Sequence, residues 1–242
     1  MKYTIFGESH GPEIGVVLTG VPAGIPLDWD FISGEMARRA PGQNALSTAR
    51  KEADIPEVVS GVFEGKTTGA PLCAVIQNTD TRSKDYGELR RKPRPSHADY
   101  AAYVASGGCR DYRGGGHFSG RLTAPLVFAG AVAKQVLKPQ GIHVSARISM
   151  VGGVKDPTPQ QLEAVILAAK QAGDSVGGTI ACSVEGMPAG LGAPDFGCNV
   201  EGIFSQYLFA VPAVKGVAFG AGFALASMRG SEANDPFYMD GG

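Results

Sequence analysis

Three successive glycines at 114–116 stand close before the apolar segment 122–137, and this junction strongly constrains the fold. The apolar segment predicts a helix, so the glycines predict a loop that opens it. Such a loop exposes backbone N–H groups at the positive end of the helix dipole. Arg110, Arg113 and Arg121 add fixed positive charge around it. The junction predicts a site for a phosphate-bearing ligand, and a tight turn without a ligand is the alternative.

The composition is that of a globular protein with balanced charge. The chain has 242 residues, 43% of them hydrophobic, which suffices for one large domain or two small ones. Its formal net charge of −1 gives no indication of a nucleic-acid partner. No apolar run reaches the length of a membrane span, and the first residues do not form a signal peptide. We therefore expect a cytoplasmic protein without a membrane partner.

The cysteines favour the same compartment. They are far apart in the sequence and form no CxxC pair: Cys73, Cys109, Cys182 and Cys198. This spacing predicts reduced thiols rather than a disulfide framework or a zinc site.

Two histidines lie in motifs that are rich in proton-transfer groups. His10, in FGESHG at 6–11, is a candidate general acid or base, and the alternative is a histidine that bonds to neighbouring backbone. His97 and Asp99, in RPSHADY at 94–100, are a weak metal-ligand pair, so an acid near an anion is the preferred interpretation of His97. His143 is expected on the surface face of a strand.

Hydrophobic periodicity and capping residues predict the regular elements. Two helices are expected at 122–137 and 199–210. A third is capped by Asp28 or Asp30 and ends at Arg39, and a fourth starts at Thr158 with a capping box and ends near 172. The expected strands are 14–18, 58–63, 71–77, 142–148, 178–184 and 214–219. A polar loop at 78–96 is long enough to be functional or mobile.

The chain also contains a short internal repeat. The segment LTGVPAGI at 18–25 matches VEGMPAGL at 184–191, and each copy lies between an expected strand and an expected helix. A match of this length can arise by chance. If it is a true repeat, it predicts two halves related by a pseudo-two-fold axis.

Long motifs in the same order along the whole chain carry a family resemblance. They are FGESHG at 6–11, RRAPG at 38–42, SGVFEGKTTGAP at 60–71, NTDTRSKDY at 78–86, RPSHADY at 94–100, RDYRGGG at 110–116, GMPAGLGAP at 186–194, AVKGV at 213–217 and RGSEANDPF at 229–237. Together they resemble chorismate synthase. The resemblance implies an α+β fold, with a helical layer sandwiched between two antiparallel sheets and a pseudo-two-fold internal repeat. It also implies a homotetramer.

The resemblance implies a carbon–oxygen lyase reaction. That family converts 5-enolpyruvylshikimate-3-phosphate to chorismate by an anti 1,4-elimination of phosphate and a ring proton. The family reaction requires reduced FMN although it involves no net redox change. NADPH or a separate flavin reductase is the implied source of the reduced flavin, and the sequence leaves these two open.

The resemblance assigns substrate and acid–base roles to five residues. His10 matches the histidine proposed to protonate the reduced flavin, and His97 matches the one proposed to act near the leaving phosphate. Arg39 matches an arginine at the substrate phosphate, with Arg50 beside it. Ser9 is assigned to the substrate as well.

The flavin contacts are assigned in the same way. His117, Phe118 and Ser119 match the flavin-binding loop, and Pro212 with Ala213 matches a further flavin contact. No metal ligand is implied.

The chain departs from the family pattern in three ways. His117 stands where the family loop, commonly RSSARET, begins with arginine, and Ala45 stands where many members have a basic residue. The sequence is read as one chorismate synthase-like domain over 1–242 that lacks the family's C-terminal portion. From this we expect weak FMN binding and little turnover.

Two other functions remain open. One is an inactive or partial fragment that binds flavin or phosphate without catalysis. The other is a metal-dependent hydrolase built on His10, His97, Asp99 and His117, whose scattered positions make it the weaker hypothesis.

Overall fold

The structure, a computed structural model, describes residues 1–42, 52–79, 86, 88, 90–192, 196–237 and 239. The chain forms two compact units, Met1–Met187 and Pro188–Gly242. The prediction of a single domain over 1–242 stays a prediction. Ala45 and Arg50 lie outside the described residues.

The first unit contains a four-stranded antiparallel sheet in the order β1-β2-β6-β3. Its strands are β1 (Lys2–Gly7), β2 (Glu13–Thr19), β3 (Pro56–Ser60) and β6 (Leu72–Gln77). Side chains alternate between the two faces of a strand, so every second residue of β2 and β6 enters the core. These buried residues are Ile14, Val16, Leu18, Leu72, Ala74 and Ile76. The strands expected at 14–18 and 71–77 are thereby confirmed.

Two helices, α1 (Trp29–Arg39) and α3 (Thr123–Leu137), pack against this core. The carboxylate of Asp28 caps α1 by accepting a hydrogen bond from the backbone N–H of Phe31 at 2.9 Å. The backbone N–H of Asp28 donates to Gln135 Oε1 at 2.7 Å, which ties the start of α1 to the last turn of α3. Both expected helices are confirmed.

The strand expected at 58–63 is interrupted at Gly61. The segment forms β3 and then β4 (Val62–Phe63), which pairs with β5 (Lys66–Thr67) in a separate hairpin. Gly61 has a φ of +86°, and a Cβ atom there would lie 2.4 Å from the Cα of Leu72. Only glycine combines a positive φ with the absence of a Cβ atom. The chain therefore changes direction at Gly61, although the apolar pattern of the sequence continues.

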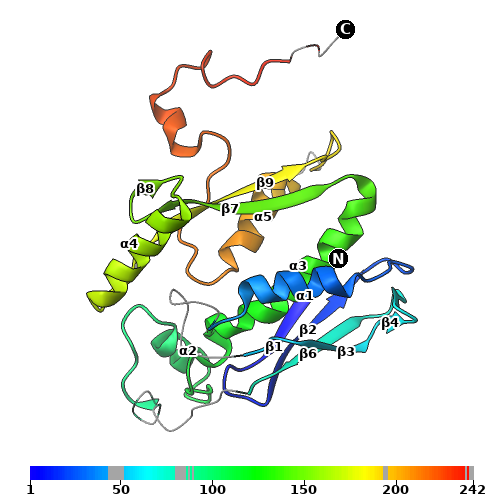
Figure 1. Ribbon diagram of the computed structural model, residues 1–242, viewed down its shortest axis with the longest axis vertical. Coiled ribbons are helices and arrows are strands. Elements are labelled where there is room, and N and C mark those ends of the chain that lie inside the picture. Colours follow the sequence, from blue (N-terminus) through cyan, green and yellow to red (C-terminus); the bar gives the residue numbers. More distant parts are fainter. Residues whose placement is uncertain are drawn as a thin grey trace. The chain divides into compact units, whose positions relative to one another are not determined.

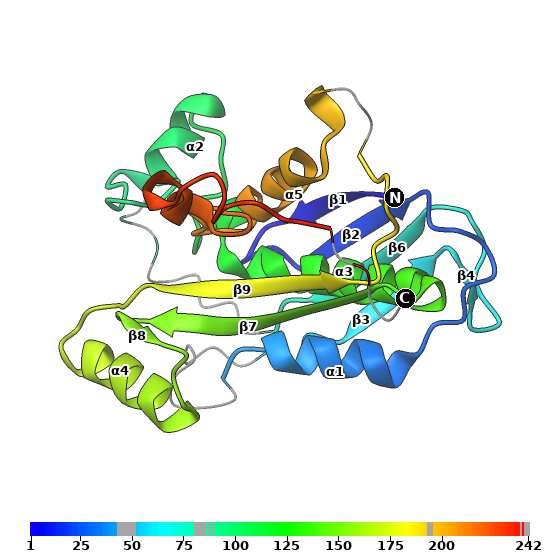
Figure 2. The ribbon, with the colours of Figure 1, turned by 90° about the horizontal axis from the view of Figure 1, so that it is seen from above.

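A second sheet lies on the other side of the helices. It has the order β8-β7-β9 and consists of β7 (His143–Val151), β8 (Val154–Lys155) and β9 (Gly178–Glu185). Figure 1 shows α1 and α3 between the two sheets, and Figure 2 shows β7 and β9 running across α3. The predicted α+β fold with a helical layer between antiparallel sheets is confirmed.

The helix α4 (Pro159–Gln171) connects β8 to β9. It begins with the predicted capping box, in which Thr158 and Gln161 bond to each other's backbone N–H groups. His143, the first residue of β7, is exposed as expected.

The two copies of the repeat begin alike. β2 pairs with β1 and β9 pairs with β7, and each then enters its GVPAG or GMPAG turn. β2 has a second neighbour, β6, whereas β9 has one neighbour among the described strands. Ile180 of β9 is 65% exposed, while Ile14, Val16 and Leu18 of β2 are buried.

The second unit is helical and irregular. Its elements are the 3-10 helix η5 (Phe196–Cys198), α5 (Val200–Phe209) and the 3-10 helix η6 (Gly222–Ser227). Asn199 caps α5, which confirms the helix expected at 199–210. The strand expected at 214–219 is wrong, because the described part of this unit offers it no strand to pair with. No helix in the described parts of the chain is both long and apolar enough to cross a membrane.

Candidate active site

The loop after β1 and the glycine loop are bonded together. The backbone N–H of Ser9 donates to the carbonyl of Gly116 at 3.1 Å. The Ser9 hydroxyl accepts from the N–H of Gly115 at 3.4 Å and donates to the carbonyl of Arg113 at 3.5 Å. The glycine N–H groups were expected to face a ligand. Instead, that of Gly115 contacts Ser9 and that of Gly116 bonds to Arg113 within a turn.

The chain reaches α3 through two short 3-10 helices, η2 (Gly116–Phe118) and η3 (Gly120–Leu122). The glycines therefore do not open α3 directly, which corrects the predicted junction. The side chain of Ser119 caps η3 by accepting from the N–H of Arg121 at 3.3 Å.

His10 lies against the glycine loop. Gly114 has a φ of +64°, and a Cβ atom there would lie 2.4 Å from His10 Cε1 and 2.8 Å from Ser9 Oγ. The imidazole also contacts Ser9 Oγ, 3.1 Å from Nδ1, and the ring of Tyr86, edge-on with centroids 5.0 Å apart. His10 is therefore a largely buried group held between two loops, as both sequence interpretations allow.

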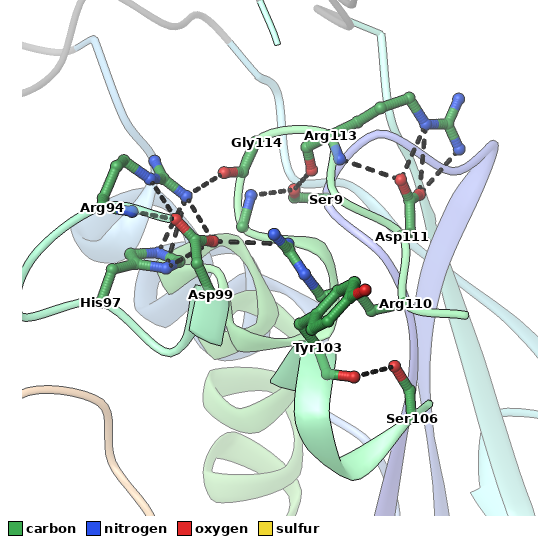
Figure 3. Close-up of polar contacts among 11 residues, drawn as sticks. Ser9, Arg94, His97, Asp99, Tyr103, Ser106, Arg110, Asp111, Arg113 and Gly114 are labelled. Carbon is green, nitrogen blue, oxygen red and sulfur yellow. Dashed lines mark hydrogen bonds and ion pairs between the residues drawn. The ribbon is translucent and has the colours of Figure 1, made fainter. Parts of the chain in front are cut away.

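A buried carboxylate organises the third loop, and its neighbours form what we call the Asp99 cluster: Arg94, His97, Asp99 and Arg110. Asp99 is 1% exposed. Its Oδ2 accepts from Arg94 Nε at 2.8 Å, and its Oδ1 lies 2.9 Å from His97 Nδ1 and 3.4 Å from Arg110 Nη1 (Figure 3). The cluster brings one histidine and two arginines to a single anion.

The charge of Asp99 is strongly stabilised. Side-chain hydrogen bonds from Arg94 hold the pKa of Asp99 well below its usual range, although burial acts in the opposite direction. The same bonds raise the pKa of Arg94. These contacts therefore favour the charged form of the Asp99 carboxylate.

Local sequence explains why this loop closes on itself. Asp99 is the first residue of the short helix α2 (Asp99–Ala105), where a negative side chain is favoured by the helix dipole. Its carboxylate also accepts from the backbone N–H of Arg94 at 3.0 Å, and Ser96 takes a positive φ of 58° between them. Sequence analysis missed α2 because seven residues are too few to display a hydrophobic period.

The Asp99 cluster reaches the glycine loop through Arg94. The Nη2 atom of Arg94 donates to the carbonyl of Gly114 at 2.5 Å, next to the position where Gly114 meets His10 (Figure 3). The structure therefore brings the two predicted catalytic histidines into one connected network.

A second buried carboxylate forms the Asp54 cluster, which consists of Arg39, Glu52, Asp54 and Arg121. Asp54 accepts short hydrogen bonds from both Arg39 Nη1 and Arg121 Nη1. Arg39 Nε also donates to Thr123 Oγ1 at 3.3 Å, and Arg121 Nη2 lies 3.8 Å from Glu52. Both acidic residues therefore lie beside specific arginines.

Asn78 joins the Asp54 cluster to the loop after β1. Its Oδ1 accepts from Arg121 Nε at 3.0 Å. Its Nδ2 donates to the carbonyls of Glu8 and Gly11 at 3.1 and 2.9 Å. The loop that carries Ser9 and His10 is therefore anchored from both sides, by the Asp54 cluster and by the glycine loop.

The three arginines predicted to surround the glycine loop each meet an aspartate. Arg110 contacts Asp99, Arg121 bonds to Asp54, and Arg113 pairs with Asp111 at 2.7 Å. Side-chain hydrogen bonds from Arg113 lower the pKa of Asp111. The positive charge is thus balanced locally. Asp111 lies in the glycine loop itself, whereas Asp54 and Asp99 come from other segments, so their pairing could not be read from the loop sequence.

The predicted flavin loop lies at the mouth of a small cavity. His117 Nδ1 is 2.9 Å from the carbonyl of Gly7, so the imidazole fixes the loop to the end of β1. Phe118 is 55% exposed and stands edge-on to His117. A cavity of about 150 Å³ is lined by residues that include Glu8, Asp99, Arg110, Asp111, His117 and Phe118. Pro212 and Ala213 belong to the second unit, where Ala213 has a φ of +69°.

The family model for chorismate synthase matches residues 1–241. The chain belongs to the chorismate synthase family. A chorismate synthase of Chitinophaga pinensis is 51% identical over 234 residues, which are 97% of this chain and 68% of that protein. One from Thermococcus gammatolerans is 45% identical over 261 aligned positions, which cover all of this chain and 73% of that protein.

A solved structure agrees with this family assignment. A crystal structure of chorismate synthase superposes with a TM-score of 0.77 at 26% identity, over 97% of this chain and 73% of that one. The resemblance read from the motifs, and the fold it implied, are therefore confirmed. The site roles of individual residues stay predictions.

The metal-dependent hydrolase has no structural support. Within the described residues, no three His, Cys, Asp or Glu side chains form a group that could hold a metal ion. Asp99, one of its proposed ligands, is instead occupied by Arg94 and His97. Membership in the chorismate synthase family favours elimination chemistry over metal-assisted hydrolysis.

Proposed function

We propose that this chain forms chorismate from 5-enolpyruvylshikimate-3-phosphate by an anti 1,4-elimination. The observation that carries the proposal is the meeting of three family motifs, at 6–11, 94–100 and 110–116, in one bonded network. In this reaction the substrate loses its phosphate and a ring proton, and a second ring double bond forms. The protein has to stabilise a departing phosphate and supply it with a proton.

Arginines provide the phosphate contacts in this proposal. The guanidinium of Arg39 bonds to Asp54, Thr123 and the carbonyl of Gly120 through Nη1, Nε and Nη2. A guanidinium has five N–H donors, so two remain beyond these three contacts within the described residues. Arg39 can therefore bind a phosphate while Asp54 holds it in place, with Arg50 and Ser9 proposed beside it.

His97 holds the proton for the departing phosphate. Its side chain is 29% exposed, whereas that of Asp99 is 1% exposed, so the imidazole is the more accessible group of the pair. A histidine suits this work because its ordinary pKa lies near neutral pH. His10, on the other side of Gly114, is proposed to hold a proton toward the flavin.

The loop at 117–119 fits one edge of an FMN. The exposed ring of Phe118 offers an apolar surface, and no atom lies within 4 Å of where a Cβ at Gly120 would stand. His117, Phe118 and Ser119 would hold the cofactor, and Pro212 and Ala213 keep the flavin contact that the family resemblance implies. Reduced FMN, when bound, supplies electron density that eases phosphate departure and is recovered at the end. NADPH, or a separate reductase, is proposed to maintain it in the reduced state.

The wider assignments rest on the family. Chorismate formation places the chain in aromatic amino acid biosynthesis, and we propose a cytoplasmic homotetramer. The described cysteines are all free thiols, which supports a reducing compartment.

Anaerobic turnover tests the proposal. The 242-residue chain is mixed with the substrate and photoreduced FMN, and phosphate and chorismate are measured together. We expect slow turnover that releases both in equal amounts, and a further loss of about 10²-fold or more in His97→Asn, because general acid catalysis contributes that much. His143→Asn, on an exposed strand end, is the matched control and should keep full activity. Binding of substrate or FMN without phosphate release would instead support the noncatalytic fragment.

A further inference from the structure

We propose that Thr123 is a positioning residue that holds the guanidinium of Arg39 in the orientation in which it meets the substrate phosphate. This inference rests on the proposed function, because it takes Arg39 as a phosphate contact. The hydrogen bond on which it depends is a property of the chain without any ligand. The orientation of Arg39 and its use can therefore be tested separately.

The hydroxyl of Thr123 lies between Arg39 and the turn at Gly120. Its oxygen accepts a hydrogen bond from Arg39 Nε at 3.3 Å, and its O–H donates to the carbonyl of Gly120 at 2.6 Å. Arg39 Nη2 donates to the same carbonyl at 3.5 Å. Nε and Nη2 belong to one rigid plane, so a hydroxyl and a carbonyl that bond to each other hold one edge of the guanidinium.

The proton positions in this arrangement follow from the groups themselves. A carbonyl oxygen only accepts hydrogen bonds and a guanidinium only donates them. The Thr123 O–H therefore points to the Gly120 carbonyl, and a lone pair of its oxygen is left for Arg39 Nε. Because the backbone N–H of Thr123 also donates to the Gly120 carbonyl at the start of α3, the support is part of the helix end and does not depend on a flexible side chain.

Asp54 holds the guanidinium at a different nitrogen. It accepts a short hydrogen bond from Arg39 Nη1, which balances the charge but leaves the plane able to turn about that contact. Thr123 and Gly120 prevent this turn by holding Nε and Nη2. Within the described residues, one N–H of Nη1 and one of Nη2 then remain, and paired donors of this kind suit two oxygens of a phosphate.

Two substitutions separate the hydroxyl of Thr123 from its shape. Thr123→Val replaces the hydroxyl by a methyl group, so Arg39 Nε loses its acceptor. Thr123→Ser keeps the hydroxyl and removes only the methyl group. If Thr123→Val does not fold, Thr123→Ala, which removes the hydroxyl without adding a methyl group in its place, is used instead.

The first measurement needs no ligand. In ¹⁵N-labelled protein, the Nε–H signal of Arg39 is assigned through its side-chain carbons to its backbone, and its exchange with water is measured. We expect slow exchange in the wild-type chain and in Thr123→Ser, and fast exchange in Thr123→Val. Fast exchange in the wild-type chain, or slow exchange in Thr123→Val, overturns the inference.

The second measurement is the affinity for 5-enolpyruvylshikimate-3-phosphate without flavin, by calorimetry. Thr123→Val should bind it about tenfold more weakly, because a hydrogen bond that orients a charged group is lost. Thr123→Ser should stay within about twofold of the wild-type chain. An unchanged affinity in Thr123→Val, or an equal loss in Thr123→Ser, contradicts the positioning role.

The control removes a threonine hydroxyl that has only a structural use. Thr158 caps α4 by accepting from the backbone N–H of Gln161 at 3.2 Å. Thr158→Val should lower the stability, as loss of a cap does, and leave the substrate affinity unchanged. A similar loss of affinity in both valine variants would show that the effect of Thr123→Val is merely structural. A protected Nε–H in a wild-type chain that does not bind the substrate would refute the proposed function and retain Thr123 as the residue that orients Arg39.

Discussion

The Asp54 and Asp99 clusters share one plan and differ in exposure. In each, a buried aspartate binds two arginines. The Arg121 side chain in the Asp54 cluster is 2% exposed, whereas Arg94 in the Asp99 cluster is 37% exposed and has a histidine beside it. The buried Arg121 therefore acts as an anchor, whereas Arg39 in the Asp54 cluster and His97 in the Asp99 cluster keep enough exposure for a ligand to reach them.

The largest expected effect comes from removing the charge of Asp54. Asp54→Asn leaves Arg39 and Arg121 without their shared anion, and breaking a buried ion pair costs about 3–5 kcal/mol. Urea denaturation measures the change in the free energy of unfolding. Asp156→Asn, which breaks an exposed pair with Arg147, is the control. A loss below about 1 kcal/mol in Asp54→Asn would place both clusters in the same class as surface pairs.

The next effect tests the link between the Asp99 cluster and His10. Gly114→Ala adds a Cβ atom 2.4 Å from the His10 ring at a φ of +64°, and such a conformation costs about 1–3 kcal/mol in a residue with a side chain. We expect lower stability together with a weakened Ser9–His10 loop, measured by denaturation and by turnover. Gly34→Ala, in the middle of α1 with open space around it, should instead stabilise by about 0.5–1 kcal/mol.

A smaller effect appears on acidification. Because hydrogen bonds from Arg94 lower the pKa of Asp99, the folded state binds fewer protons there than the unfolded chain. The stabilisation is complete above the ordinary carboxyl range and is lost as the pH falls below about 4. Urea titrations between about pH 6 and pH 3 should show a shallower slope in Asp99→Asn than in wild type. An equal slope in both would contradict this account.

Part of that slope should survive in Asp99→Asn. Hydrogen bonds from Arg113 also lower the pKa of Asp111, and this pair is untouched by the substitution. Gly34→Ala introduces no titratable group and should keep the full wild-type slope.

The smallest effect is expected on the second sheet. Arg147 and Asp156 form a pair at 2.5 Å, but both side chains are largely exposed. Arg147→Ala should change the free energy of unfolding by only about 0–1 kcal/mol. Thermal denaturation at low and high salt measures it. If Arg147→Ala lost as much unfolding free energy as Asp54→Asn, and did so in a salt-sensitive way, exposure would not explain the difference between buried and exposed ion pairs.

Regular elements were predictable because their signals are local. The buried alternation of β2 and β6, the Asp28 cap of α1 and the capping box at Thr158 are all written in a few neighbouring residues. The strands expected at 58–63 and 214–219 were not predicted correctly, because a strand depends on a partner that lies elsewhere in the chain.

The histidines of the site were predictable from their motifs, but the anions beside them were not. Asp54 and Asp111 look like ordinary charges in the sequence, and Asp99 was considered only as a weak metal ligand. Their roles depend on which arginine the fold brings to each. A pairing between residues 67 positions apart, such as Arg121 with Asp54, leaves no local pattern to detect.

The bonding of Asn78 has a consequence for the chemical lifetime of the protein. Asparagine deamidates when the backbone nitrogen of the next residue attacks its side chain. In the folded chain that nitrogen, of Thr79, donates to Glu52 at 3.0 Å, while the Asn78 amide is held by Arg121, Glu8 and Gly11. Folding therefore protects the residue from ageing. If Asn78 were converted to aspartate in an unfolded molecule, a carboxylate oxygen would face the carbonyls of Glu8 and Gly11. The loop that carries His10 would then not return to its folded position.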